Sequence, residues 1–329
     1  MVPAEKLIQQ YLKTDQYTIT RLKGDGSDRG IFRVASNLTS VILIQSVNID
    51  ENKNFIYLTK VLEKKGIPVP KIYAINDDFS CYLLEDLGNS TLADLLYGNK
   101  TEYEPFKIEA YRKVVRYLIE IQNKLKDLSS SSIQYKQMDF DVYYSDLQYF
   151  ITEFLKQFHF QAKISTSIQS EFNQLLNSLI TVDHNYFVYR DFQSRNFMWV
   201  DNSPVFIDYQ GAMMGSLYYD LGSLLYSSRS GLSQQERDLI IQFYYEKKQL
   251  QIPFQDFLRH LYRFILLRRL RSLGSYGFLS RKGKFHFAGY IPQALEELVM
   301  LFDLGDLTSF KHIRKMMVAI QKEWGSKTI

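Results

Sequence analysis

Residues 187–210 read FVYRDFQSRNFMWVDNSPVFIDYQ, and this stretch indicates the fold of the whole chain. Two apolar runs, residues 197–200 and 205–210, are separated by the polar residues 201–204. This alternation of apolar run, polar break and apolar run is typical of a β-hairpin. The sequence therefore predicts a short hairpin inside a region that is otherwise helical.

The expected register brings two polar side chains to the open end of this hairpin. With Val200 facing Val205, Asn196 and Asp208 meet there, and Asp191 precedes the first strand. Oxygen ligands of this kind suit Mg²⁺, which also binds substrate phosphates, and a further carboxylate can accept a proton from a hydroxyl. These are the groups that phosphoryl transfer needs. Taken alone, the three residues fit turn and strand-cap roles equally well.

A glycine-rich segment lies between two β-prone runs near the start of the chain. Residues 17–22 and 31–34 flank Gly24-Asp25-Gly26-Ser27-Asp28-Arg29-Gly30, which predicts a hairpin with a glycine-rich tip. Glycine-rich tips often have no role beyond turning the chain. Ser27 and Arg29 in the same tip favour contact with phosphate.

The first quarter of the chain is rich in expected strands and the remainder in expected helices. Further strands are predicted at residues 41–44, 72–75 and 81–84, with one helix through Phe55, Leu58 and Leu62 and a connector at 85–88. Apolar residues then recur at helical spacing in 107–126, in 147–158 and beyond 254. We therefore expect an α+β protein of two lobes, residues 1–88 and residues 89–329.

The composition excludes several classes of protein. The net charge is +4, and the sequence contains no block of like charges. Nothing in the composition therefore indicates a nucleic-acid partner. The single cysteine, Cys81, excludes a disulfide framework and is expected to be a buried hydrophobe. Apolar runs are far shorter than the roughly 18 residues of a spanning helix. We expect a cytoplasmic protein with no membrane partner, and the sequence does not indicate its oligomeric state.

Several of these segments together resemble aminoglycoside phosphotransferases and choline kinase-like proteins, which share the two-lobed protein-kinase fold. The segments that carry the resemblance are the glycine-rich tip, residues 83–88 (LLEDLG), residues 189–196, residues 207–210 and residues 219–222 (YDLG). Within that family the chain is most similar to bacterial kinases of cell-wall amino sugars (N-acetylmuramate and N-acetylglucosamine), which act at the anomeric hydroxyl. Residues 273–278 (LGSYGF) support this subgroup.

The resemblance implies a role for each matching residue. Asp191 is the expected catalytic base, Asn196 and Asp208 are the expected Mg²⁺ ligands, and Asp220 braces the catalytic loop. The implied ATP site is formed by Gly24, Gly26 and Ser27 of the phosphate loop and by the backbone of Glu85 to Leu87. The implied substrates are ATP and a small-molecule hydroxyl compound, with a sugar or amino sugar as the expected acceptor.

Three departures from the family pattern qualify these expectations. Tyr189 stands where the family usually has histidine, and Gln193 stands where the sugar kinases often have histidine. The third strand carries no cation for the nucleotide phosphates, and no clear glutamate partner occurs at the matching place in the helix that follows. Arg29 and Arg33 are the expected substitutes, because a guanidinium binds phosphate oxygens in pairs.

Two other functions remain open at this point. The missing third-strand cation is compatible with a nucleotide-binding regulatory module with weak or no catalysis, whereas the complete set of Asp191, Asn196 and Asp208 favours an enzyme. An aminoglycoside-modifying enzyme is disfavoured because cationic drugs prefer an acidic cleft.

Two further groups of residues are expected to be structural. Arg268, Arg269 and Arg271 are expected on a solvated helix face rather than in an anion site. Tyr276 and Phe278 are expected in the core rather than against a sugar.

Overall fold

The computed structural model describes residues 2–22, 29–98, 104–126, 137–160, 163–305 and 307–327. These residues form two compact units. The first is built mainly from Met1–Tyr117 and Ser194–Ala212, and the second from Leu118–Leu128, Tyr135–Gln193 and Met213–Ile329. The expected phosphate-loop residues Gly24, Gly26 and Ser27 lie outside the described residues. The lobe boundary expected after residue 88 stays a prediction.

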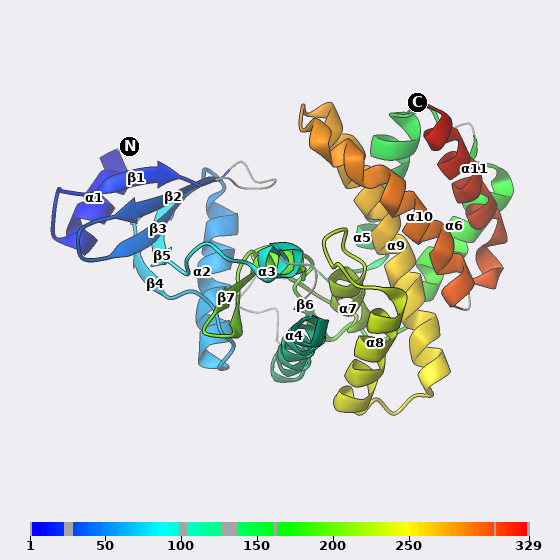
Figure 1. Cartoon of the computed structure of the whole chain (residues 1–329), viewed down its shortest axis with the longest axis horizontal. Helices are drawn as coiled ribbons and strands as arrows, with labels where there is room; N and C mark the ends of the chain where they lie inside the picture. The colour runs from blue at the N-terminus through cyan, green and yellow to red at the C-terminus, as the bar shows by residue number, and fades with distance from the viewer. Residues whose placement is uncertain are drawn as a thin grey trace. The chain divides into compact units, whose positions relative to one another are not determined.

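The first unit contains a five-stranded antiparallel sheet in the order β1-β2-β3-β5-β4 (Figure 1). Its strands are β1 (Thr18–Arg21), β2 (Gly30–Ala35), β3 (Ser40–Gln45), β4 (Ile72–Ile75) and β5 (Cys81–Glu85). They confirm the strands expected from the sequence, including the hairpin formed by β1 and β2. One face of the sheet is covered by helix α1 (Val2–Leu12), which shares a core with Val34, Val41, Leu43, Cys81 and Leu83. Cys81 is buried, as expected.

Helix α2 (Ile49–Lys64) packs on the sheet through aromatic side chains. Its N-cap, Asn48, accepts a hydrogen bond from the backbone N–H of Glu51, which satisfies one of the unpaired donors of the first turn. Phe55 of α2 stacks on Tyr82 of β5, with ring centroids 5.5 Å apart. Side chains alternate between faces along β5, so Tyr82 lies on the opposite face from Cys81 and Leu83. The helix that the 55, 58, 62 spacing predicted is confirmed.

The rest of the first unit consists of α3 (Leu92–Gly98), the start of α4 (Glu104–Lys124), the short η4 (Ser194–Asn196) and the hairpin of β7 (Phe197–Val200) and β8 (Ser203–Phe206). The hairpin is confirmed, but the expected register is wrong. Val200 pairs with Ser203 and Phe197 with Phe206. The reason lies in the turn: Asp201 and Asn202 have φ values of 48° and 59°. Two successive residues with positive φ close a two-residue hairpin loop, in place of the expected four-residue break.

The second unit is mostly helical. Strands β6 (Tyr186–Val188) and β9 (Met213–Gly215) form an antiparallel pair. The helices are α5 (Phe140–Phe150), η2 (Ile151–Lys156), α6 (Thr166–Leu179), α7 (Tyr218–Leu225), α8 (Gln234–Lys248), α9 (Phe254–Arg281), η5 (Phe285–Tyr290), α10 (Ile291–Leu304), η6 (Thr308–Phe310) and α11 (Lys311–Lys327). The expected apolar face of 147–158 is confirmed, since Leu147, Phe150, Phe154 and Leu155 are all fully buried.

Helix α9 runs through the second unit and packs closely on α5 and η2 (Figure 1). Two glycines allow this approach. A Cβ on Gly277 would lie 1.9 Å from the carbonyl oxygen of Glu153, and one on Gly274 would lie 2.9 Å from that of Tyr149. The LGSYGF segment therefore has a packing role. Tyr276 in it is 8% exposed, which confirms the expected core position.

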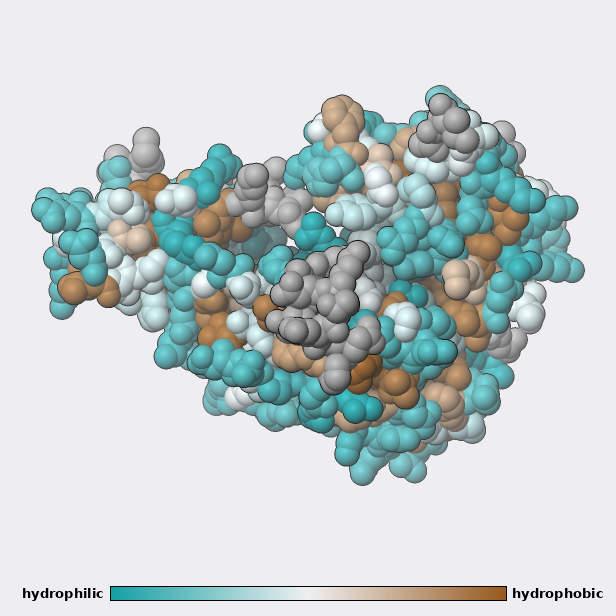
Figure 2. All heavy atoms as spheres, viewed as in Figure 1, coloured by the Kyte–Doolittle hydropathy of each residue, from teal (hydrophilic) through white to brown (hydrophobic). Residues whose placement is uncertain are grey.

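Together the sheet-rich and helix-rich parts confirm the expected two-lobed α+β fold. Among the described residues, no helix combines the length and apolar character that crossing a membrane requires. Figure 2 shows that hydrophilic residues cover most of the face in view, with hydrophobic ones in small separate groups.

Candidate active site

The predicted site residues are divided between the two compact units. Asp191 belongs to the second unit, together with Asp220. Asn196, Asp208, Arg29, Arg33, Glu85 and Leu87 belong to the first.

In the second unit, Asp220 holds the loop that carries Asp191. Its Oδ2 accepts a hydrogen bond from the backbone N–H of Tyr189 at 2.6 Å, and its Oδ1 accepts one from the backbone N–H of Arg190 at 3.0 Å. Arg190 has a φ of 73°, a conformation that is uncommon for a residue with a side chain. Two hydrogen bonds to one carboxylate hold this loop in place, which confirms the bracing role expected of Asp220.

The environment of Asp220 raises the pKa of its carboxyl. The side chain is 1% exposed. Burial raises the pKa of the Asp220 carboxyl to about 7, although the two backbone donors and the Arg268 guanidinium act in the opposite direction. The charge of Asp191 is a further cause that raises this pKa. The two carboxylates are therefore electrostatically coupled.

Tyr189 occupies the position where the family usually has histidine. It is 1% exposed and packs edge-on against Phe192, with ring centroids 5.3 Å apart. Tyr189 is thus a core residue that anchors the loop beside Asp191.

In the first unit, Asn196 and Asp208 lie at the open end of the β7–β8 hairpin. The backbone N–H of Ile207 donates to the carbonyl of Asn196 at 3.1 Å, which brings the residue before Asp208 against Asn196. The two residues are therefore close along the backbone at this end of the hairpin, although the strand register differs from the expected one. Their joint binding of Mg²⁺ stays a prediction. Asp208 has a φ of 70°, and its Oδ1 accepts a hydrogen bond from Gln210 Nε2 at 2.7 Å.

Helix α2 holds the segment that carries Asp208. The ring of Tyr209 stacks on Phe55 with centroids 4.9 Å apart and planes 5° apart. The Tyr209 hydroxyl shares a hydrogen bond with Thr59 at 2.6 Å, and Asn54 Nδ2 donates to the carbonyl of Gln210 at 2.6 Å. These three contacts hold Tyr209 and Gln210 against helix α2, and so they fix the backbone that directly follows Asp208.

Arg29 forms an ion pair that the sequence did not indicate. Its guanidinium, at the start of β2, pairs with the carboxylate of Glu51 in the first turn of α2. The Arg29 side chain is only 10% exposed. A glutamate partner for Arg29 is therefore present in the first turn of the helix after the third strand.

The pKa of the buried Tyr82 hydroxyl is affected by several charged side chains. Burial raises the pKa of Tyr82, Arg29 lowers it, and both Glu51 and Asp208 raise it further. One cation and two carboxylates therefore act on the same hydroxyl.

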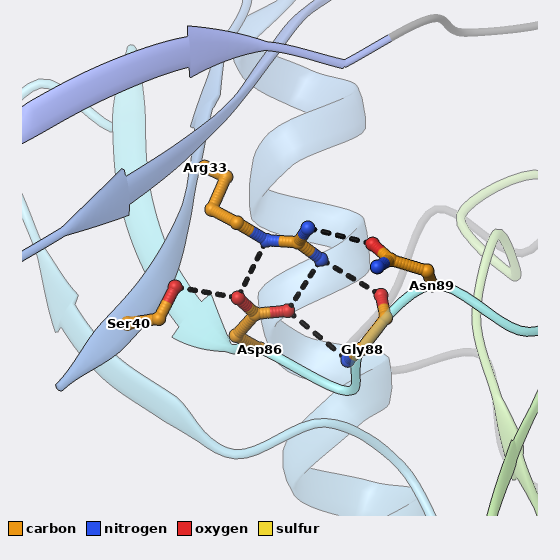
Figure 3. Close-up of a pocket in the computed structure, with 5 residues that line it drawn as sticks. All are labelled: Arg33, Ser40, Asp86, Gly88 and Asn89. Carbon is orange, nitrogen blue, oxygen red and sulfur yellow. Dashed lines mark hydrogen bonds and ion pairs between the residues drawn. The ribbon is translucent and has the colours of Figure 1, made fainter.

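Arg33 has a different environment, in a pocket of about 480 Å³ formed with Ser40, Asp86, Gly88 and Asn89 (Figure 3). Its Nε and Nη2 donate to the two oxygens of Asp86 at 2.7 and 2.9 Å. Nη1 donates to Asn89 Oδ1 and Nη2 also donates to the carbonyl of Gly88 (Figure 3). The guanidinium thus ties β2 to the segment that follows β5.

Asp86 is the centre of this network. Burial raises its pKa, but the hydrogen bonds from Arg33, Ser40 and the Gly88 backbone outweigh burial, so the pKa lies below its ordinary value. Ser40 Oγ donates to Asp86 Oδ2 at 2.6 Å. The contacts fix the connector that contains Glu85 and Leu87. The backbone N–H of Glu85 donates to the carbonyl of Lys71 at 2.9 Å, which ties the start of the connector to β4.

Sequence reasoning missed three residues in these surroundings: Glu51, Tyr82 and Asp86. A signal was present for Glu51 alone, because an acidic residue in the first turn of a helix is favoured and can face a cation nearby. Tyr82 and Asp86 owe their roles to neighbours that are distant in the sequence.

Comparison with known proteins gives three results. The sequence profile of the phosphotransferase enzyme family (APH) matches residues 18–251. The chain is 25% identical over 283 residues to the N-acetylmuramate/N-acetylglucosamine kinase of Pseudomonas aeruginosa, covering 82% of this chain and 79% of that protein. It is 24% identical over 293 residues to the enzyme of the same name from Neisseria meningitidis serogroup B, covering 86% and 85%.

The fold also matches a solved structure. The choline kinase LicA from Streptococcus pneumoniae superposes with a TM-score of 0.62 at 15% identity, covering 90% of this chain and 99% of that one. At this level of identity the match concerns the fold alone. The family profile spans well over half of the chain and includes every described residue of the candidate site, and so the protein belongs to the phosphotransferase enzyme family.

Proposed function

We propose that the protein is an ATP- and Mg²⁺-dependent kinase that transfers the γ-phosphate to a hydroxyl of a sugar, with an amino sugar as the preferred acceptor. Membership of a phosphotransferase family and two relatives named as amino-sugar kinases support this proposal. Its location in the cytoplasm remains a prediction from the sequence.

Asp191 is the proposed catalytic base. Its carboxylate accepts the proton of the acceptor hydroxyl as the oxygen forms its bond to the γ-phosphorus, and the bond to the β-phosphate oxygen breaks to release ADP. The observation that carries this proposal is the double hydrogen bond from the loop backbone to Asp220, because a base is effective only when its position is fixed. The neighbouring Tyr189 is buried and adds to the rigidity of the loop.

Asn196 and Asp208 are the proposed Mg²⁺ ligands. One amide and one carboxylate oxygen suit a hard cation that completes its coordination with water and phosphate oxygens. Among the described residues, no cluster of three or more His, Cys, Asp or Glu side chains forms a full metal cage. This agrees with a site that has few protein ligands and is shared with nucleotide. When bound, Mg²⁺ neutralises charge on the phosphate oxygens.

The nucleotide is proposed to bind in the first unit. The backbone of Glu85 to Leu87 contacts the adenine, and Gly24, Gly26 and Ser27 contact the phosphates. Arg29 supplies the cation that the third strand lacks, and Glu51 orients it. Arg33 was expected to share this task. Its guanidinium instead contacts Asp86, Asn89 and Gly88, so we propose that it supports ATP binding indirectly, by fixing the connector.

A coupled assay of ADP release, with ATP, Mg²⁺ and a panel of sugars, amino sugars and one aminoglycoside, tests the proposal. We expect acceptor-dependent ADP release with an amino sugar, and a loss of about 100- to 10,000-fold in kcat for Asp191→Asn. Binding of ATP without ADP release, for every acceptor, would favour the regulatory module instead. Unchanged kcat in a folded Asp191→Asn variant would exclude Asp191 as the base.

A further inference from the structure

Two of the three α9 arginines that were expected on a solvated face, Arg268 and Arg269, are buried, which corrects that expectation. Arg268 is 5% exposed and Arg269 is 2% exposed. Arg269 has a structural role, since it donates to the carbonyl of Tyr226 at 2.7 Å and pairs with Glu297 at 2.8 Å. Arg268 and Arg271 instead reach toward the loop that carries Asp191.

Arg268 is connected to this loop through one side chain. Its Nη2 donates to Ser223 Oγ at 2.8 Å, and Ser223 Oγ in turn donates to the carbonyl of Arg190 at 3.4 Å. Nη1 of Arg268 donates to the Tyr219 hydroxyl at 3.0 Å. Helix α9 is therefore coupled to the residue that directly precedes the proposed base.

Asp146 of α5 lies between two further guanidinium groups. Its Oδ1 accepts a hydrogen bond from Arg271 Nε at 2.7 Å and lies 3.8 Å from Arg190 Nη2. Asp146 is only 6% exposed, and its Oδ2 is buried without a hydrogen-bond partner among the described residues. A buried carboxylate oxygen that lacks a partner is unfavourable. A donor on a bound ligand would satisfy it.

The two guanidinium groups are only partly used by the protein. In the part of the chain that the structure describes, Nε is the one Arg271 guanidinium nitrogen that makes a hydrogen bond, so Nη1 and Nη2 remain for a ligand. The side chains of Arg190 and Arg271 are 23% and 29% exposed, which leaves both accessible. The positive charges of Arg190 and Arg271 face the negative charge of Asp146, and Arg268 and Asp191 add one charge of each sign nearby.

The charge of Asp191 acts on this cluster. Burial lowers the pKa of Arg271, but Asp146 and then Asp191 are among the charges that raise it above its ordinary value. The cluster therefore lies within electrostatic range of the proposed base. Arg190 of this cluster also directly precedes Asp191 in the chain, so the cluster borders the proposed base.

We propose that Arg271, Arg190 and Asp146 form an acceptor subsite that selects an acidic sugar over its neutral counterpart. This inference rests on the proposed kinase function. The Nη groups of Arg271 bind the carboxylate of the acceptor in the paired geometry that a guanidinium favours. Asp146 Oδ2 accepts a hydrogen bond from a hydroxyl or amide N–H of the same ligand. Arg190 supplies the second positive charge.

The test compares N-acetylmuramate, which carries a lactyl carboxylate, with N-acetylglucosamine, which does not. For the wild-type protein, kcat/KM is expected to be higher for N-acetylmuramate. Arg271→Gln is expected to lower kcat/KM for N-acetylmuramate by roughly 10- to 100-fold, while kcat/KM for N-acetylglucosamine changes by less than about 3-fold. Arg271→Lys keeps the charge but loses the paired donors, so its kcat/KM for N-acetylmuramate is expected to lie between those of the wild type and Arg271→Gln. This variant also serves if Arg271→Gln does not fold.

Arg281→Gln is the matched control, because Arg281 lies on the same helix and pairs with Glu153 at an exposed position. It is expected to leave both values unchanged. Calorimetric binding of N-acetylmuramate to the same proteins, without ATP, gives a readout that does not depend on catalysis. Equal losses for the two sugars in Arg271→Gln, or unchanged binding of N-acetylmuramate, would overturn the subsite. A wild-type protein that binds N-acetylmuramate but transfers phosphate to no sugar would overturn the kinase function and leave the subsite standing.

Discussion

The guanidinium of Arg29 at the start of β2 pairs with the carboxylate of Glu51 in the first turn of α2. This pair provides the first unit with a fixed cation at a place where the third strand has none. A cation that is held by a carboxylate and partly removed from water is well suited to receive phosphate oxygens. The pair therefore bears on how the protein binds nucleotide.

Arg29→Ala is expected to raise the KM for ATP by roughly 10- to 100-fold, because a hydrogen bond to a charged group contributes about 1.5–3 kcal/mol. Glu51→Gln is expected to raise it less, since Arg29 keeps its charge and loses only its orientation. Initial rates at varied ATP measure both effects. Arg21, on the exposed strand β1, provides the control, and Arg21→Ala should have no effect. An ATP KM in Arg29→Ala equal to that of the wild type would contradict this role.

Arg33→Ala is expected to lower the free energy of unfolding by about 1–3 kcal/mol, because Asp86 then remains partly buried without its paired donor. Urea unfolding at pH 7 measures the loss. Asp86 has a pKa below its ordinary value of 3.8. Its stabilising contribution is therefore present above about pH 4 and is lost as the pH falls through the lower folded-state pKa. The difference between wild type and Arg33→Ala should shrink below pH 4, and a constant difference would refute the coupling.

Asp220 should produce the opposite dependence on pH. Its carboxyl has a folded-state pKa of about 7 against an ordinary value of 3.8, so the folded state binds the proton more tightly than the unfolded state. The stability that Asp220 contributes is then greatest below pH 4 and declines as the pH rises to 7, by up to about 1.4 kcal/mol per pH unit. Asp220→Asn removes this slope. Between pH 5 and pH 7, the unfolding free energy of the wild type should therefore fall relative to that of Asp220→Asn. A constant difference between the two proteins at pH 5, 6 and 7 would argue against the raised pKa.

Tyr209 should link the stability of the first unit to the Asp208 segment. Tyr209→Phe removes the hydroxyl that bonds to Thr59 and is expected to cost about 1–2 kcal/mol of unfolding free energy. Tyr209→Ala also leaves a cavity beside Phe55 and is expected to cost about 3–5 kcal/mol. Thermal and urea unfolding measure both. Tyr144→Phe, at a position 42% exposed, serves as the comparison and should change little. Equal stability of Tyr209→Phe and wild type would show that the hydroxyl contact does not matter.

Much of the fold could be predicted because its signals are local. The spacing of Phe55, Leu58 and Leu62 marks the buried face of α2, and short apolar runs mark β3, β4 and β5. The β7–β8 register could not be predicted with equal accuracy. Asp201 and Asn202 both adopt positive φ, which these two residue types tolerate but do not require. The expected polar break, residues 201–204, is therefore two residues longer than the observed loop of Asp201 and Asn202.

The site was predictable where it depends on sequence motif and not where it depends on long-range partners. The bracing of the Tyr189–Arg190 backbone by Asp220 follows from the motif and is present. The pairing of Arg33 with Asp86, and the burial of Arg268 beneath Tyr219, depend on segments that are distant in the chain. The local sequence around an arginine does not indicate whether the fold provides such a partner.

The most direct test of the central claim is phosphorus NMR of the protein with ATP, Mg²⁺ and either N-acetylmuramate or N-acetylglucosamine. The account predicts that the ATP γ-phosphate signal declines while a sugar phosphate signal grows, split by coupling to the anomeric proton, and that the Asp191→Asn protein produces almost none of it. Turnover of ATP to inorganic phosphate alone, or no change with either sugar, would contradict the account.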